Sequence, residues 1–125
     1  MAGLFKKKTF AEGETIFKEG DPPDAVYMVE SGLVDMTIRR ISGEDMIIGT
    51  IGPGEMFGEM ALIDNQPRMA TAKVAMETRL VVIPPEAFRA QLKTVNPIMS
   101  KVMVQLTKRL RSMAQEIAIA DKQRR

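Results

Sequence analysis

The sequence contains no histidine, no cysteine and no tryptophan among its 125 residues. Without histidine and cysteine, the chain cannot build Ser–His or Cys–His catalytic pairs, thiolate nucleophiles, tetrahedral zinc sites or disulfide bonds. No run of apolar residues approaches the roughly eighteen that a membrane-spanning helix needs. We therefore expect a cytoplasmic protein with no catalytic residues, no metal and no membrane partner, and a binding module is favoured over an enzyme.

The composition that remains is that of a folded domain. The chain is 45% hydrophobic and 27% charged, and its length predicts a single domain over residues 1–125. The net charge of +2 conceals an asymmetry, because residues 12–64 carry twelve acidic and three basic side chains, whereas residues 65–125 carry twelve basic and four acidic ones. A basic rear half can indicate a nucleic acid or a membrane surface as partner, but a solvated helix face is the simpler interpretation.

Closely spaced turn signals predict antiparallel strands in the first two-thirds of the chain. Between glycine-, proline- and aspartate-containing turns lie β-type runs at 15–17, 26–29, 33–40, 46–51, 71–76 and 80–83. In the run 33–40, Val34, Met36 and Ile38 fall on one face and polar residues on the other. The pattern predicts a jelly-roll-like antiparallel β-roll of about eight strands over residues 9–84.

The rear of the chain changes to a helical pattern, which makes the expected fold class α+β. Pro85 begins a short helix over residues 85–94, and Asn96-Pro97 is typical of the cap and first position of a helix over 97–121. Apolar residues on this long helix recur at alternating spacings of four and three: Met99, Met103, Leu106, Leu110, Met113, Ile117 and Ala120. This heptad seam packs either on the β-roll or on a second copy of the chain as a homodimer.

The segment 57–72 interrupts the strands and carries the chemistry. Gly58 permits close approach of a ligand to the backbone, and residues 59–63 suit one helical turn whose first N–H groups can bind an anion. A phosphate takes such amides together with a guanidinium, which Arg68 supplies. Glu59 cannot bind phosphate but can accept from a sugar hydroxyl, so the combination indicates a nucleotide. The alternative is that Glu59 and Arg68 only form an ion pair that closes a loop.

The stretch Phe57-Gly-Glu-Met-Ala-Leu-Ile-Asp-Asn-Gln-Pro-Arg-Met-Ala-Thr-Ala72 resembles the phosphate-binding cassette of the cyclic nucleotide-binding domain family. Residues 12–21 look like the opening strand and turn of that family, and residues 27–34 look like its next hairpin. The resemblance therefore covers nearly the whole chain. It implies a β-roll with a short cassette helix, and reversible binding of a cyclic nucleotide without any reaction.

The resemblance also implies a role for individual residues of the cassette. Gly58 and Glu59 would hold the ribose 2′-hydroxyl, the amide of Ala61 would reach the cyclic phosphate, and Arg68 would neutralise it. The backbone after Arg68 would complete the phosphate site, and Thr71 would line the same pocket. The expected ligand-binding set is Gly58, Glu59, Met60, Ala61, Arg68, Met69, Ala70 and Thr71.

Two further expectations follow from the resemblance. Family members that favour cGMP tend to carry threonine directly after the arginine, and Met69 offers no hydroxyl there, so we expect cAMP ahead of cGMP. Helix 97–121 would close over the base as a lid, so that ligand binding shifts the helix between two positions and signals to a downstream protein that the sequence does not identify.

Other functions fit the sequence less well than this sensor. A family-like scaffold could dimerise and bind no nucleotide, but it would need neither Glu59 nor Arg68. A DNA-binding regulator needs a helix-turn-helix, and the residues after the strands offer one long heptad helix, so no nucleic acid is expected. An enzyme that hydrolyses the nucleotide is least expected, because the sequence has no histidine and no cluster of metal-ligating residues. The basic residues Lys108, Arg109 and Arg111 could reach the base or an acidic partner, or form a solvated flank.

Overall fold

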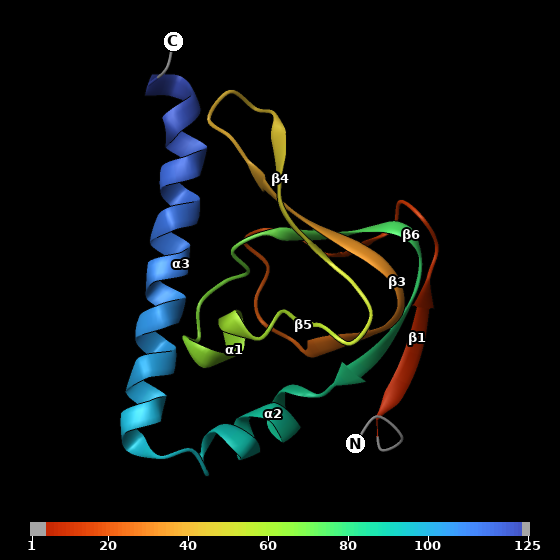
Figure 1. Ribbon diagram of the computed structural model, residues 1–125, viewed down its shortest axis with the longest axis vertical. Helices are drawn as coiled ribbons and strands as arrows, with labels where there is room; N and C mark the ends of the chain where they lie inside the picture. Colours follow the sequence, from red (N-terminus) through yellow and green to blue (C-terminus); the bar gives the residue numbers. More distant parts are fainter. Residues whose placement is uncertain (1–4, 124–125) are drawn as a thin grey trace.

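A computed structural model describes residues 5–123, so the expected domain extends at both ends slightly outside the described residues. The strands form a curved sheet, α3 runs along one side of it, and α1 lies between α3 and the strands (Figure 1). The elements in chain order are β1 (Lys6–Phe10), β2 (Thr15–Phe17), β3 (Val26–Arg39), β4 (Asp45–Ile51), β5 (Met56–Phe57), α1 (Met60–Ile63), β6 (Thr71–Ile83), α2 (Pro85–Leu92) and α3 (Pro97–Gln123).

The long strands β3 and β6 form the spine of the sheet. They pair antiparallel from Val26 opposite Ile83 to Thr37 opposite Thr71. β1 and β2 add to successive halves of β6, while β5 and β4 add to successive halves of β3. Because both spine strands bend midway, the flanking strands curl toward each other, and the predicted antiparallel β-roll with C-terminal helices is confirmed.

The predicted number of strands is wrong, because two predicted breaks lie inside continuous strands. The runs 26–29 and 33–40 belong to β3, and the runs 71–76 and 80–83 belong to β6. Ser31-Gly32 is therefore not a hairpin turn. The pairing of β3 with β6 shifts register around these residues, and Gly32 adopts a φ of +100° against Thr78. A glycine at a bulge bends a strand without ending it. The Ser31-Gly32 pair, which is typical of a turn, therefore marks a bend within β3.

The core of the roll is filled by the inward faces of the strands and three aromatic rings. Val34 and Ile38 are buried, as the alternation in 33–40 predicts. The rings of Tyr27 and Phe57 stack with centroids 5.2 Å apart, and the ring of Phe17 lies 6.0 Å from that of Phe57. Such pairs add specific geometry to the burial of apolar surface. The segment 57–72 is joined to this cluster by Phe57 itself and by Arg68, whose guanidinium lies over the ring of Phe17.

The helices begin where the sequence predicts. The carboxamide oxygen of Asn96 accepts a hydrogen bond of 2.8 Å from the N–H of Ile98, which caps α3 in front of Pro97. α2 ends at Leu92, two residues before the predicted end, and α3 continues to Gln123. No helix among the described residues is long and apolar enough to cross a membrane.

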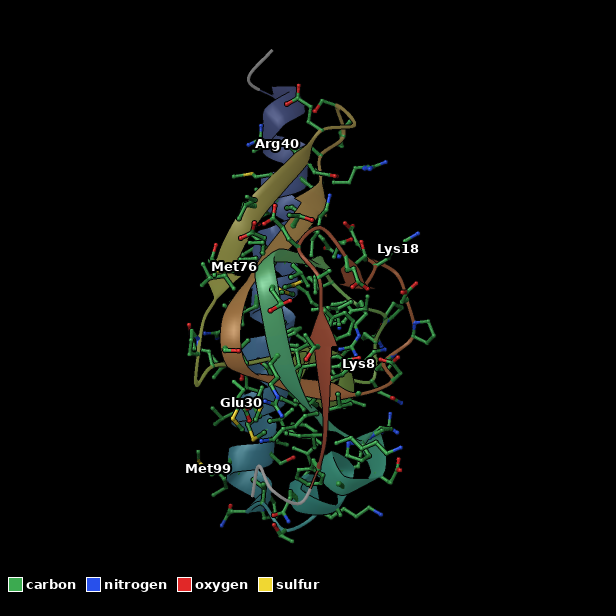
Figure 2. The ribbon with its side chains drawn as sticks, turned by 90° about the vertical axis from the view of Figure 1, so that its right-hand side faces the viewer. Lys8, Lys18, Glu30, Arg40, Met76 and Met99 are labelled. Carbon is green, nitrogen blue, oxygen red and sulfur yellow. The ribbon has the colours of Figure 1, made fainter. Side chains whose placement is uncertain are left out.

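α3 contacts the rest of the chain mainly with a face other than the heptad seam. Thr107 and Ala114 are buried on that face, and the N–H of Ile41 donates to the carbonyl of Ala118. In Figure 2, Arg40 lies in the β3–β4 hairpin beside the C-terminal half of α3, and Met99 lies near the other end of the helix. The seam residues Leu106 and Met113 are 52% and 58% exposed, so this part of the seam does not pack on the roll, whereas Leu110 of the seam lines a cavity between α3 and the roll.

Candidate functional site

Arg68 lies at the centre of the site, separated from the start of β6 by two residues. Its side chain is almost fully buried, and its guanidinium stacks over the ring of Phe17 at 4.0 Å from the ring centroid. Nη1 donates to the carbonyl of Gly58 at 2.6 Å, while Nη2 donates to the carbonyl of Ala25 at 2.7 Å and to Asp24 at 2.9 Å. Nε is buried without a partner among the described residues. The cation is therefore fixed in place, with its Nε donor unused among the described residues.

Gly58 closes over this arginine. Its φ is +84°, a conformation that side chains disfavour, and a Cβ built on it would lie 2.9 Å from Nη1 of Arg68. The same residue supplies the carbonyl that Arg68 binds. Glycine is thus required at position 58 both by the turn into α1 and by the close approach of the guanidinium.

A cavity of about 350 Å³ opens between the cassette, the strands and α3. Seven of the eight residues expected from the sequence line it: Gly58, Glu59, Met60, Ala61, Arg68, Met69 and Ala70. Arg68 and the start of α1 lie at the same cavity. The N–H groups of Leu62 and Ile63 donate to the carbonyl of Glu59, while those of Met60 and Ala61 stand ahead of the first hydrogen bond of the turn and are suited to an anion.

Glu59 brings a carboxylate into the cavity wall at the start of α1. Burial raises the pKa of this carboxyl above its usual range, and Arg68 only partly opposes that effect. Among the described residues no ion pair joins Glu59 to Arg68, whose carboxylate partner is Asp24, so the interpretation of a loop-closing Glu59–Arg68 pair is wrong. A half-buried carboxyl without a cation partner is left as an acceptor for a neutral donor such as a hydroxyl.

Thr71 is the expected residue that the structure places elsewhere. Its hydroxyl accepts a hydrogen bond of 2.9 Å from the N–H of Glu19, and it lines a separate hollow on the roll surface. Two backbone bonds of 2.8 Å, from the N–H of Gly20 to Arg68 and from the N–H of Arg68 to Asp21, tie the same loop to the cassette. Thr71 therefore helps to position the cassette and does not line the cavity.

Sequence reasoning missed the residues that surround Arg68 and those that form the far wall. Asp24 and Ala25 accept hydrogen bonds from the guanidinium of Arg68, although they lie more than forty residues before it in the sequence. No local sequence pattern predicts such a contact. The far wall has no polar side chain. It is formed by Met36, Ile48, Gly49, Ile51 and Met56 from the strands and by Leu110 from α3.

α3 is joined to the cassette by an ion pair. Both Nε and Nη2 of Arg111 donate to the carboxylate of Asp64, the residue that follows α1. The exposed fractions of the two side chains are 17% and 3%. Arg111 is therefore not part of a solvated flank, whereas Lys108 and Arg109 are exposed.

The fold and the site define a class of protein: a β-roll with a cavity whose wall combines a buried guanidinium, a carboxyl and apolar side chains. No group of three or more metal-ligating side chains occurs in the part of the chain that the structure describes. Residues 7–95 match the cyclic nucleotide-binding domain family. The chain belongs to this family.

Individual relatives agree with that membership. The chain is 31% identical over 113 residues to the cyclic AMP receptor protein of Thermus thermophilus, covering 90% of this chain and 52% of that protein. It thus spans about half the length of this relative. The cAMP-bound form of the EAL enzyme Bd1971 superposes with a TM-score of 0.84 at 32% identity, over 90% of this chain and 30% of the other. The cGMP-bound form of the same enzyme gives 0.81 at 33% identity, over 85% and 28%.

Proposed function

We propose that this chain binds cAMP reversibly and acts as a sensor module that carries out no reaction. The observation that carries the proposal is Arg68, a buried guanidinium at the wall of the cavity whose Nε donor is unpaired among the described residues. A buried donor without a partner costs about 1–3 kcal/mol, which an oxygen of a bound phosphate would recover. The names of the relatives, a cyclic AMP receptor and a cAMP-bound enzyme, support the same ligand.

The lining of the cavity suggests how the ligand lies. The cyclic phosphate would meet Arg68 and the first-turn amides at Met60 and Ala61, and its charge would be matched by the guanidinium. The ribose 2′-hydroxyl would donate to Glu59. The base would then extend toward the apolar far wall, where Leu110 from α3 covers it.

The far wall also favours adenine over guanine. Guanine carries more polar edge groups than adenine, and a wall without polar side chains leaves them unpaired. Each buried polar group without a partner costs about 1–3 kcal/mol. Met69, which lines the cavity directly after Arg68, offers no hydroxyl to compensate. We therefore expect cAMP to bind about tenfold more tightly than cGMP.

In this proposal α3 is the moving part. Ligand would favour one position of α3 over another, and the difference in affinity between the two positions would set the size of the response. The exposed seam of α3 is the surface for a second copy of the chain or for a downstream protein. The cytoplasmic location predicted from the cysteine-free sequence belongs to the same proposal.

Thermal unfolding with added nucleotide tests the proposal and separates it from the non-binding scaffold. At a hundredfold excess over its dissociation constant, cAMP should stabilise the fold by about 2.7 kcal/mol, and cGMP should do so at higher concentration. Adenosine, which lacks the phosphate, is the matched control and should give no shift at the same concentration. Unfolding that stays unchanged with millimolar cAMP and cGMP would favour the scaffold.

A further inference from the structure

The ion pair between Asp64 and Arg111 is the strongest feature that ligand binding does not itself use. The carboxylate is held in a two-pronged contact by Nε and Nη2 of Arg111, the latter at 3.0 Å. Oδ1 of Asp64 also accepts from the N–H of Gln66 at 3.3 Å. Ion pairs on the surface contribute little, but removing one partner of a pair this buried leaves an uncompensated charge. The contact therefore constrains α3 strongly.

The position of the pair relates it to the cavity. Asp64 follows the last residue of α1, whose first residues Met60 and Ala61 line the cavity. Arg111 follows Leu110, the residue of α3 that lines the same cavity. The short α1 lies beside α3 in Figure 1. The ion pair connects the residue after α1 to α3. Both walls of the cavity are thus linked through one side-chain contact.

We propose that the Asp64–Arg111 pair is a clasp that holds α3 closed over the nucleotide, which makes Arg111 and Asp64 positioning residues for the lid. This inference rests on the proposed function. Neither residue lines the cavity that we assign to the nucleotide, so the pair acts on binding through the placement of Leu110. Loss of the clasp should open the lid more often and shorten the lifetime of the complex.

The clasp predicts that dissociation is affected more than association. A lid that is held closed slows escape of the ligand, while entry occurs when the lid is open in either case. Arg109 provides a matched control, because it flanks Leu110 on the other side, carries the same charge, is exposed and makes no ion pair within the part of the chain that the structure describes. General weakening of the cationic surface would affect both arginines equally.

The experiment compares the parent chain with Arg111→Gln, Arg111→Lys, Asp64→Asn and Arg109→Gln. Stopped-flow displacement of a fluorescent cAMP analogue gives dissociation and association rates. Arg111→Gln and Asp64→Asn should dissociate about tenfold faster or more, with association within about threefold. Arg111→Lys keeps the charge but not the two-pronged contact, and should fall between these variants and the parent. Arg109→Gln should match the parent.

Hydrogen exchange without nucleotide provides a readout that does not depend on ligand binding. Amides of α3 from 104 to 114 should exchange faster in Arg111→Gln than in Arg109→Gln, while those of β3 and β6 should be unchanged in both. Equal dissociation rates for Arg111→Gln and Arg109→Gln, or equal exchange of α3 in the two, would overturn the clasp. If the parent binds no nucleotide, the proposed function fails, and the exchange comparison alone decides whether α3 is clasped.

Discussion

Arg68 shows how single residues prepare the site. Three acceptors and the ring of Phe17 hold its guanidinium, so little side-chain freedom remains to be lost when an anion binds. Of its hydrogen-bond partners, Gly58 and Ala25 use backbone carbonyls, and only Asp24 adds a negative charge. Because the side chain of Asp24 is 70% exposed, water screens its charge, and the buried guanidinium still offers positive charge to an anion at the cavity. An acidic front half of the chain makes that local charge necessary for an anionic ligand.

Gly58→Ala tests the close approach of backbone and guanidinium. The new methyl group would lie 2.9 Å from Nη1 of Arg68 and would displace it, so cAMP affinity should fall by about tenfold or more. Gly54→Ala is the matched control, because Gly54 has nearly the same φ, +85°, with nothing within 4 Å of the added group. Calorimetric titration of both variants should show the loss in Gly58→Ala alone. Equal affinities would mean that the contact has no role in binding.

Glu59→Gln tests the buried carboxyl, whose raised pKa links it to stability. The unfolded chain releases this proton at lower pH than the folded chain, so the free energy of unfolding falls as pH rises from about 4.3 through the raised folded pKa. Glutamine at position 59 does not titrate, so it removes this decrease in the free energy of unfolding. Urea unfolding at several pH values should show Glu59→Gln gaining stability over the parent between pH 4 and 7. The same variant should bind cAMP more weakly. If Glu59→Gln changes neither the stability nor the affinity, the assigned role of Glu59 is wrong.

At the scale of elements, the bend of β3 and β6 decides the shape of the roll. Gly32 sits where β3 bulges against the fully buried Thr78. The hydroxyl of Thr78 accepts from the N–H of Leu33 and donates its one proton to the carbonyl of Met76 at 2.7 Å. A Cβ on Gly32 would meet that hydroxyl at 2.3 Å. The bend therefore depends on one glycine and one threonine that lie 46 positions apart in the sequence.

Gly32→Ala should destabilise the fold by about 3 kcal/mol or more, from backbone strain together with overpacking. Gly43→Ala separates the two causes, because Gly43 has a φ of +93° with open space around it, and its cost should be about 1 kcal/mol. Chemical denaturation gives the free energy of unfolding of both variants. If the two substitutions cost the same, steric contact with Thr78 does not define the bend.

Local patterns predicted local features well and distant contacts poorly. The helical turn at 60–63, the cap at Asn96 and the inward face of Val34 and Ile38 were all predicted because their signals lie within a few residues. The break at Ser31-Gly32 was misread because glycine signals a bulge as well as a turn. Asp24 beside Arg68 was not predictable, since the contact is made only when β3, the cassette and the loop before β3 come together. Asp64 beside Arg111 escaped prediction for the same reason.

At the scale of the whole molecule, α3 divides its surface between two uses. One face, with Thr107 and Ala114, is buried against the rest of the chain. The seam remains outside, with Leu106, Met113 and Ile117 each more than a third exposed. A row of apolar side chains of this size on a helix is typical of an interaction surface. The described chain leaves it available for a second copy.

We predict that the chain dimerises through this seam and that cAMP changes the dimer's dissociation constant. Sedimentation of the parent should show a monomer–dimer equilibrium that shifts with saturating cAMP, because lid position and seam presentation belong to one helix. Leu106→Glu should stay monomeric while still binding cAMP. Gln105→Glu adds the same charge at the adjacent exposed position and should associate like the parent. A parent that remains monomeric at about millimolar concentration contradicts this use of the seam.

The central claim, that the cavity holds a cyclic nucleotide by its phosphate through Arg68, is tested most directly by calorimetric titration of cAMP into the parent and into Arg68→Lys. Lysine keeps the positive charge but lacks the planar guanidinium that binds Gly58, Ala25 and Asp24 together. We predict one cAMP per chain for the parent and an affinity about a hundredfold lower, about 2.7 kcal/mol, for Arg68→Lys. Circular dichroism should show both proteins folded. Equal affinities in the two folded proteins, or no binding by the parent, would contradict the claim.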